Sequence, residues 1–215
     1  MIEYPSIINS SKAPRKPMIA FEKIDGSNIR IKWTHKRGFD LFGSRQQLLD
    51  SSHPSLGGVV QIFHERYKDA LEETFRHEYG KENEIIVFGE YWGPSSFAGV
   101  HSDPISAMNF YLFDILFVKK SYTEFLLPQD LVKIFPKFER FGMPVPKVVY
   151  DGNLTDDFIR RVRENEFNLN EGVVCKGTQR LGSFRGKVWM CKIKTNAYLQ
   201  RLKTRFQDDW NKYYE

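Results

Sequence analysis

Residues 29–33 alternate apolar and basic side chains, which is the period-two pattern of a half-buried strand. Residues 18–23 form a second apolar run just upstream, and the Asp25-Gly26 pair between the two runs favours a tight turn. We therefore expect the two runs to pair as a hairpin. Residues 39–43 predict a further short strand.

The next elements follow from longer patterns. Apolar residues recur at helical spacing from Leu56 to Tyr79, which predicts one amphipathic helix packed on a sheet. Residues 84–88 and 109–118 are almost wholly apolar and rich in β-branched and aromatic side chains, so they predict central strands. The second half of the chain adds predicted helices over 128–141, from the N-cap Thr155 to Arg163 and from Thr195 to Tyr214, and predicted strands over 172–176 and 188–194.

The whole chain, residues 1–215, is predicted to form one α+β domain with antiparallel sheets and flanking helices. Residues 1–16 mix serine, proline and charged residues and predict irregular structure. The sequence contains no internal repeat, low-complexity segment or interdomain linker. The C-terminal helix is expected to begin at about residue 195.

The composition is that of a mildly basic protein. The 32 Lys and Arg residues against 27 Asp and Glu give a net charge of +5, which suits a polyanionic partner but discriminates little alone. Cys175 and Cys191 lie in apolar runs, so we expect buried reduced thiols, and the histidines lack zinc-ligand spacing. No apolar stretch approaches the roughly 20 residues needed to cross a bilayer, and a signal pattern is lacking, so a soluble cytoplasmic protein is expected.

Residues 21–28 combine a lysine with an acid, a glycine and two small polar side chains. A tight turn at Gly26 can leave the amine of Lys23 in a pocket rimmed by hydrogen-bonding groups. This arrangement suits a nucleophile that attacks a nucleotide. Alone, the run is a weak signal, because Lys-x-Asp-Gly also occurs in ordinary surface hairpins.

Further runs strengthen this hypothesis, and they cover residues 88–91, 110–115, 171–176 and 189–194. In this order and spacing, they and the Lys23 run resemble the covalent nucleotidyltransferase superfamily of ATP-dependent ligases and mRNA capping enzymes, most closely RNA ligases of the RNA ligase 2 type. The resemblance spans about Met18 to Lys194. It implies an α+β, ATP-grasp-like nucleotidyltransferase domain, with the nucleotide in the cleft between antiparallel sheets.

By this resemblance, the Lys23 amine attacks the α-phosphate of ATP and becomes linked to AMP. An amine must first lose its proton, and a free lysine has a pKa of about 10.4, so the site must depress the pKa of Lys23. Arg45, Lys192, Lys194 or a bound divalent cation are candidates for the positive charge that does so. Lys192 and Lys194 share one face of a strand and suit a phosphate cluster; a solvated edge strand is the alternative interpretation.

The resemblance implies nucleotide-binding roles for further side chains. Glu90, at the end of an apolar strand, is expected to bind the ribose hydroxyls, and Glu22 is expected to help read the adenine. A surface glutamate is the alternative for each. Phe113 is expected to stack on the adenine, although packing alone would also explain this residue.

Positions beside these motifs complete the expected site. Asn28 and Arg45 match family positions that contact the 3′-OH strand and the nucleotide phosphate, and a capped turn would also explain Asn28. Ile24, next to the nucleophile, and Val173 are also expected to contact the nucleotide.

Glu171 is the expected metal ligand. It precedes Gly172, which allows backbone and ligand to approach closely. Mg²⁺ or Mn²⁺ bound largely through water and phosphate needs few carboxylates. The alternative for Glu171 is a structural ion pair with Lys176 or a buried arginine. Asp114 is either a second acidic contact or a structural residue.

These motifs favour ATP-dependent RNA ligation. AMP would pass from Lys23 to a 5′-phosphate end, and the neighbouring 3′-OH would displace it, at a nick in duplex RNA or an RNA/DNA hybrid, as in RNA repair. The alternatives are a DNA ligase core, a capping guanylyltransferase that uses GTP, and a nucleic-acid-binding protein with a disused pocket. An RNA ligase differs from the first alternative, a DNA ligase core, in its preferred substrate, because the 2′-OH allows an enzyme to distinguish RNA from DNA.

Only about twenty residues follow Lys194. We therefore expect no OB-fold domain and no second C-terminal domain of the kind found in related ligases. The chain is then a minimal ligase, a fragment or half of a two-protein system. The sequence leaves the accessory domain or protein, and the oligomeric state, open.

Overall fold

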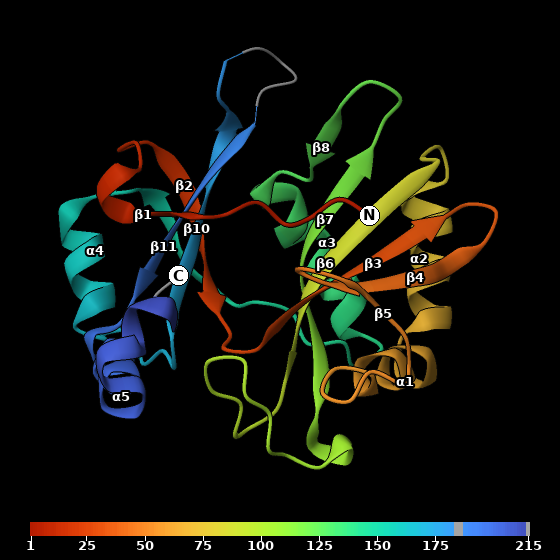
Figure 1. Cartoon of the computed structure of the whole chain (residues 1–215). Helices are drawn as coiled ribbons and strands as arrows, with labels where there is room; N and C mark the ends of the chain where they lie inside the picture. The colour runs from red at the N-terminus through yellow and green to blue at the C-terminus, as the bar shows by residue number, and fades with distance from the viewer. Residues whose placement is uncertain (183–186, 214–215) are drawn as a thin grey trace. The chain divides into compact units, whose positions relative to one another are not determined.

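The computed structural model describes residues 1–182 and 187–213, and of residues 211–213 the backbone only. The chain forms two compact units, each with its own sheet (Figure 1). Unit 1 comprises Met1–Pro5 and Gly26–Val145, and unit 2 comprises Ser6–Asp25 and Pro146–Glu215.

Unit 1 contains a six-stranded antiparallel sheet in the order β5-β4-β3-β6-β7-β8. Its strands are β3 (Ser27–Thr34), β4 (Gly38–Ser44), β5 (Leu48–Leu49), β6 (Glu84–Trp92), β7 (Asn109–Val118) and β8 (Thr123–Phe125). Its helices are α1 (Gly58–Arg66), α2 (Lys68–Tyr79) and α3 (Pro128–Glu139), with a short 3-10 turn, η2 (Ile105–Ala107).

Aromatic contacts identify the face of this sheet that the helices cover. Trp33 of β3 packs edge to face on Phe75 of α2, with ring centroids 5.9 Å apart. Phe110 of β7 packs on Phe63 of α1 at 5.6 Å, and Phe138 of α3 contacts Phe75. Because side chains alternate along a strand, residues next to Trp33 and Phe110 point to the opposite face of the sheet.

Unit 2 contains a five-stranded sheet in the order β1-β11-β10-β2-β9, in which only the β1–β11 pair is parallel among the described strands. Its strands are β1 (Ile8–Asn9), β2 (Pro17–Lys23), β9 (Val148–Asn153), β10 (Gly172–Arg180) and β11 (Val188–Lys194). Its helices are α4 (Asp156–Arg163) and α5 (Asn196–Phe206), with 3-10 segments η1 (Ser10–Lys12) and η3 (Gln207–Tyr213).

The core of unit 2 lies between its sheet and α4. The Thr155 hydroxyl accepts a hydrogen bond from the Phe158 backbone N–H at 3.1 Å, which confirms the expected N-cap. Phe158 and Val162 of α4 are buried against strand residues that include Val173 and Ile193. This packing fixes the positions of β10 and β11, which carry several candidate site residues.

Cys175 and Cys191 are both buried and free, as the sequence predicts. They lie opposite each other on β10 and β11. The neighbouring Cys191 thiol and burial raise the pKa of Cys175 well above its usual value, so this thiol stays protonated.

The expected hairpin at Asp25-Gly26 is wrong. β2 pairs with β9 and β10 in unit 2, whereas β3 pairs with β4 and β6 in unit 1. Gly26 does not have a positive φ. A Cβ at this position would lie 2.6 Å from the Tyr91 carbonyl oxygen, so close backbone approach explains the glycine.

Two predicted helices also need correction. The run from Leu56 to Tyr79 forms two helices, α1 and α2, which are separated by Tyr67 with φ −127°. Tyr67 is buried and its hydroxyl donates to the Asn109 side chain, so tertiary contacts favour the break. The last helix ends at Phe206, because Gln207 has φ +47° and a 3-10 segment follows. The predicted last residue, Tyr214, lies outside the described residues.

Other boundaries differ by smaller amounts. The strands predicted at 84–88 and 172–176 are longer, ending at Trp92 and Arg180. Within residues 1–16, expected to be irregular, the structure contains β1 and η1. Of the helices that the structure describes, none combines the length and apolar character needed to span a membrane.

Candidate active site

Two lysines from separate motifs meet one carboxylate in unit 2. Lys23 ends β2, Lys194 ends β11, and Glu171 immediately precedes β10. The Lys23 Nζ donates to Glu171 Oε2 at 2.8 Å, and the Lys194 Nζ lies 3.2 Å from Glu171 Oε1. The strand register explains the meeting, because Gly172 pairs with Lys23 on one side and with Lys194 on the other.

The side chains that form these ion pairs are buried to different extents. The Glu171 side chain is 2% exposed, the Lys194 side chain 6% and the Lys23 side chain 23%. A buried carboxylate is costly without partners, and here two ammonium groups compensate it. Lys23 is the most exposed member of the cluster, so its amine is the group that a ligand can reach most easily.

Gly172 holds the ends of β10 and β11 close together. A Cβ on this residue would lie 2.0 Å from the Ile193 carbonyl oxygen. Only glycine avoids this overlap, so the expected close approach at Gly172 is observed for the backbone. The close approach positions Glu171 beside Lys194.

The two ammonium groups are near enough to affect each other. Burial lowers the pKa of Lys194, the Lys23 charge lowers it further, and Glu171 acts in the opposite direction. Lys194 is held beside Lys23 by the Glu171 carboxylate, which both ammonium groups contact.

Strand alternation separates the other candidates in unit 2. The register places Lys192 on the face of the sheet that carries Lys23 and Lys194. Glu22 and Val173 lie opposite each other on the other face, where Val173 is completely buried in the core. The structure therefore brings Lys192 toward the cluster but not the side chains of Glu22 and Val173. Ile24 is half-buried.

Tyr198 and Asp25 extend the cluster. The Tyr198 hydroxyl donates to Asp25 Oδ2 at 2.9 Å, and the Lys194 Nζ lies 5.0 Å from the centre of the Tyr198 ring. Burial, then the charges of Glu171 and Asp25, raise the pKa of Tyr198 far above 10. The hydroxyl therefore remains a donor that can hold the Asp25 carboxylate. Tyr198 was not predicted as a site residue, because helical spacing on α5 gives no sign of a contact with residue 25.

Unit 1 places Asn28 and Glu90 side by side on the face of its sheet away from the helices. The two residues are opposite each other on β3 and β6. The Asn28 Oδ1 atom is buried and has no hydrogen-bond partner among the described residues. A buried acceptor without a donor is costly, so this atom suits a ligand that carries hydroxyl or amino groups.

Tyr4 is a second residue that sequence analysis missed. Its ring packs edge to face on Phe113, with centroids 5.0 Å apart, and its hydroxyl donates to Asp114 Oδ2 at 2.8 Å. Burial, Asp114 and Glu90 raise the pKa of Tyr4 well above 10. Phe113 keeps part of its surface exposed. Arg45 is exposed just after β4.

The sequence model of the RNA ligase family matches residues 16–193, which is most of the chain. This chain belongs to the RNA ligase family. The match confirms the resemblance inferred from the motifs, which lie at residues 21–194. Among curated proteins, none matches the sequence at a significant level.

Solved structures of an RNA ligase from Naegleria gruberi are similar to this family member. The form with pyrophosphate has a TM-score of 0.66 and 18% identity, covering 95% of this chain and 59% of that one. A variant with AMP and Mn has a TM-score of 0.65 and 17% identity, covering 93% and 58%. A variant with ATP and Mn has a TM-score of 0.61 and 17% identity, with the same coverage of 93% and 58%.

These similarities confirm the α+β nucleotidyltransferase fold. The chain spans a little under three fifths of the length of the Naegleria ligase. At this level of identity, the likeness establishes the fold alone.

Proposed function

We propose that this chain is an ATP-dependent RNA ligase in which Lys23 carries AMP as a covalent intermediate. The observation that carries the proposal is the cluster of Lys23, Glu171 and Lys194, because motifs far apart in the sequence converge on one carboxylate. Membership of the RNA ligase family supports the same conclusion.

In the first step, the Lys23 Nζ attacks the α-phosphorus of ATP. A P–N bond forms while the bond to the bridging oxygen breaks, and pyrophosphate leaves. Lys23 must give up a proton, and the proposed acceptor is Glu171 Oε2, to which the Lys23 Nζ donates at 2.8 Å. Lys192 and Lys194 supply positive charge for the phosphate oxygens.

In the second step, an oxygen of an RNA 5′-phosphate attacks the phosphorus of the lysine-linked AMP. The P–N bond breaks and Lys23 regains a proton. In the third step, the 3′-OH loses its proton and its oxygen attacks the phosphorus of the 5′-phosphate. The phosphodiester bond forms while the bond from that phosphorus to the bridging oxygen breaks, and AMP leaves with this oxygen. We assign the proposed substrate as RNA with 5′-phosphate and 3′-OH ends at a nick.

Further nucleotide contacts are proposed for the residues that the family resemblance identifies. Asn28 and Glu90 present neighbouring polar groups that suit hydroxyls of a ribose or a 3′-OH end, and Phe113 offers an aromatic face for adenine. Arg45 is proposed to contact phosphate, and Glu22 and Ile24 to contact the nucleotide beside Lys23. Val173 can take part only through its backbone, because its side chain is buried.

A divalent cation, Mg²⁺ or Mn²⁺, is proposed to bind at Glu171. The donor chemistry fits, since hard cations prefer carboxylate oxygens. The Asp25 carboxylate is a second donor of this type nearby, because its charge and that of Glu171 both act on Tyr198. When bound, the cation would neutralise charge on the phosphates.

The deciding experiment is incubation with α-labelled ATP or GTP, followed by denaturing electrophoresis and by assays on nicked duplexes. The proposal predicts acid-labile label from ATP, and sealing of nicks with RNA on the 3′-OH side. Label from GTP alone would indicate a capping enzyme, and equal sealing of all-DNA nicks would indicate a DNA ligase. Absence of label from either nucleotide would indicate a binding protein.

A further inference from the structure

A cavity of about 280 Å³ lies beside β1 and β11, on the side of the unit 2 sheet where β1 is the edge strand. Its polar lining includes three cationic residues and several neutral ones, among them Arg163, Lys192, Lys194, Asn9, Ser10 and Asn196. Among the described residues, no aspartate or glutamate lines the cavity. Its walls therefore offer hydrogen-bond donors and positive charge.

The fold brings these residues together from five elements, β1, η1, α4, β11 and α5. Asn9 of β1 is in register with Lys192 of β11, which places the N-terminal strand at this edge. Arg163 is the last residue of α4, and Asn196 is the first residue of α5. The first backbone N–H groups of a helix favour anions, so the start of α5 adds to the positive character of the cavity.

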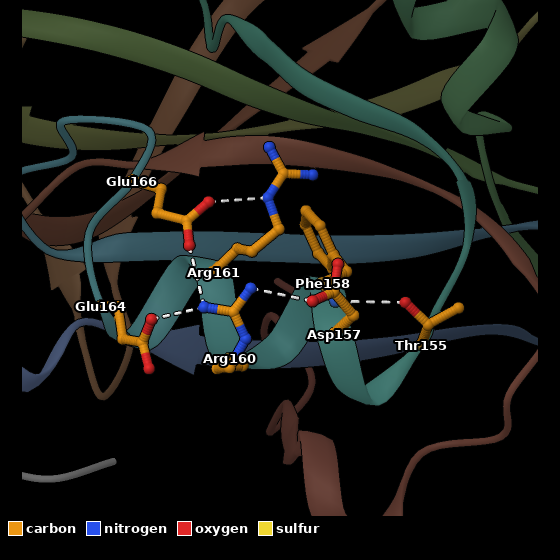
Figure 2. Close-up of polar contacts among 7 residues, drawn as sticks. All are labelled: Thr155, Asp157, Phe158, Arg160, Arg161, Glu164 and Glu166. Carbon is orange, nitrogen blue, oxygen red and sulfur yellow. Dashed lines mark hydrogen bonds and ion pairs between the residues drawn. The ribbon is translucent and has the colours of Figure 1, made fainter.

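The arginines of α4 differ sharply in their surroundings. Arg160 forms ion pairs with Asp157, Glu164 and Glu166, and Arg161 pairs with Glu166 at 2.8 Å (Figure 2). These charges are neutralised on the helix surface. The Arg163 side chain is exposed and, unlike those of Arg160 and Arg161, forms no ion pair within the described part of the chain. It is therefore available to an external anion.

We propose that this cavity binds a phosphate group, with Arg163 as its main side-chain anchor. The guanidinium can bind two phosphate oxygens at once, and the neighbouring lysines add point charges. The volume of about 280 Å³ is close to the lower end of the range of about 300 to 1,000 Å³ for small-molecule pockets, so the cavity has room for a phosphate and its neighbouring groups.

The proposal rests on the proposed ligase function for the source of the phosphate. Two sources share this chemistry: the β- and γ-phosphates of ATP, and a phosphodiester of the RNA backbone. Lys192 and Lys194 line both this cavity and the face of the sheet that carries Lys23. A phosphate here would therefore lie next to the proposed reaction centre.

The test compares Arg163→Ala with Arg160→Ala in the full chain. Both variants remove one arginine from α4 and lower the net charge from +5 to +4, so a difference between them reports the cavity and not overall charge. One arm measures the KM for ATP in self-adenylylation. The other measures binding of a nicked RNA duplex without ATP, by fluorescence anisotropy over a series of salt concentrations.

If the phosphate belongs to RNA, Arg163→Ala should weaken duplex binding about tenfold and reduce the salt slope by about 1, with the KM for ATP unchanged. If it belongs to ATP, the KM should rise about tenfold and duplex binding should be unchanged. Arg160→Ala should change neither quantity appreciably. Arg163→Lys keeps the charge without the two-pronged geometry and should fall between wild type and Arg163→Ala.

Equal effects of Arg163→Ala and Arg160→Ala, or no effect of Arg163→Ala in either arm, would overturn the inference. The result remains separable from the ligase proposal. If wild-type protein takes no label from ATP, the ligase proposal fails, but the duplex-binding arm still tests the cavity. If every variant is labelled normally and binds the duplex equally, the ligase proposal stands and the cavity has no phosphate role.

Discussion

At the scale of single residues, the carboxylate of Glu171 is shared by two ammonium groups, and its loss would remove a negative charge from beside both of them. In Glu171→Gln the shape is kept but the charge is removed. We expect self-adenylylation to slow about 100-fold, as when a general base is lost, and to need more magnesium for half-maximal rate. A magnesium titration of the labelling rate measures both effects, and a wild-type titration curve would show that Glu171 is structural only.

The proposed nucleophile makes a stricter prediction. Lys23→Ala should abolish covalent AMP, because the variant lacks the proposed nucleophile. The other amine beside Glu171 belongs to Lys194, which ends a different strand and whose side chain is more buried. Lys23→Arg should fail equally, since a guanidinium stays protonated and is a poor nucleophile. Mass spectrometry of the intact variants after incubation with ATP checks this result. AMP found on a different lysine at the wild-type rate would contradict the assignment.

Tyr198 should act on the reaction by holding Asp25. In Tyr198→Phe the ring packing remains, but the hydrogen bond to Asp25 at 2.9 Å is lost. We expect self-adenylylation to slow roughly tenfold, the scale seen when a supporting contact to an acidic ligand is removed, and the magnesium requirement to rise. Tyr150→Phe is the matched control, because Tyr150 stacks on Phe158 within unit 2. If both variants have the wild-type magnesium requirement, Tyr198 has a packing role alone.

At the scale of elements, the pattern within a segment predicted the boundaries of some strands correctly, but it did not predict which segments pair or contact each other. The strand boundaries at 109–118 and 188–194 agree with the structure, because continuous apolar and β-branched runs determine both the element and its ends. The supposed hairpin at Asp25-Gly26 failed, since local turn preference does not reveal which strand will be the partner. The break at Tyr67 depends on a contact with Asn109 that spacing within the helix does not contain.

The candidate site shows the same division. Motif residues on strand ends, such as Lys23 and Lys194, could be selected from the sequence, and the strand register then brings them to Glu171. Tyr4 and Tyr198 could not, because their hydrogen bonds join residues 110 and 173 positions apart. Alternation also explains why Val173, which belongs to a site motif, has its side chain in the core.

His101 connects the loop between β6 and β7 to β3 by hydrogen bonds. One of its ring nitrogens lies 2.8 Å from the Ser27 hydroxyl of β3, and the other lies 2.8 Å from the Ser96 hydroxyl in the same loop. Burial lowers the pKa of His101 below the usual 6.5, and Asp103 opposes this only partly. As pH falls below about 6.5, this histidine takes up a proton in the unfolded chain before it does so in the folded protein. The contribution of neutral His101 to the free energy of unfolding is therefore present above this pH and is lost as the pH falls further.

Urea unfolding at pH 7.5, 6.5 and 5.5 measures this dependence. Wild-type protein should lose free energy of unfolding across the series. His101→Ala should be less stable at pH 7.5, by about 1 kcal/mol, and should show a smaller loss on acidification. His77→Ala is the control, because the His77 side chain is 83% exposed. A pH slope in His101→Ala equal to that of wild type would show that His101 is not responsible.

At the scale of the whole molecule, the proposed half-reactions place different demands on charge. Self-adenylylation needs one ATP at Lys23, whereas sealing needs a polyanion to be held while its ends react. The net charge is only +5, and duplex binding that relies on phosphate contacts weakens steeply with salt, with a slope of about 0.9 per contact. Short-range pairs that are mostly buried, such as Glu171 with Lys194, are screened much less.

We therefore expect rising salt to abolish nick sealing before it affects self-adenylylation. A salt series that follows both reactions on one preparation tests this order, using labelled ATP and a nicked duplex with RNA on the 3′-OH side. A duplex that already carries AMP on its 5′-phosphate serves as the control, because it bypasses Lys23 and isolates the last step. If duplex binding is limiting, sealing of this substrate should show the same steep dependence. Sealing that persists at a salt concentration where self-adenylylation has failed would contradict the argument, because it would place the salt-sensitive contact at the nucleotide and not along the RNA.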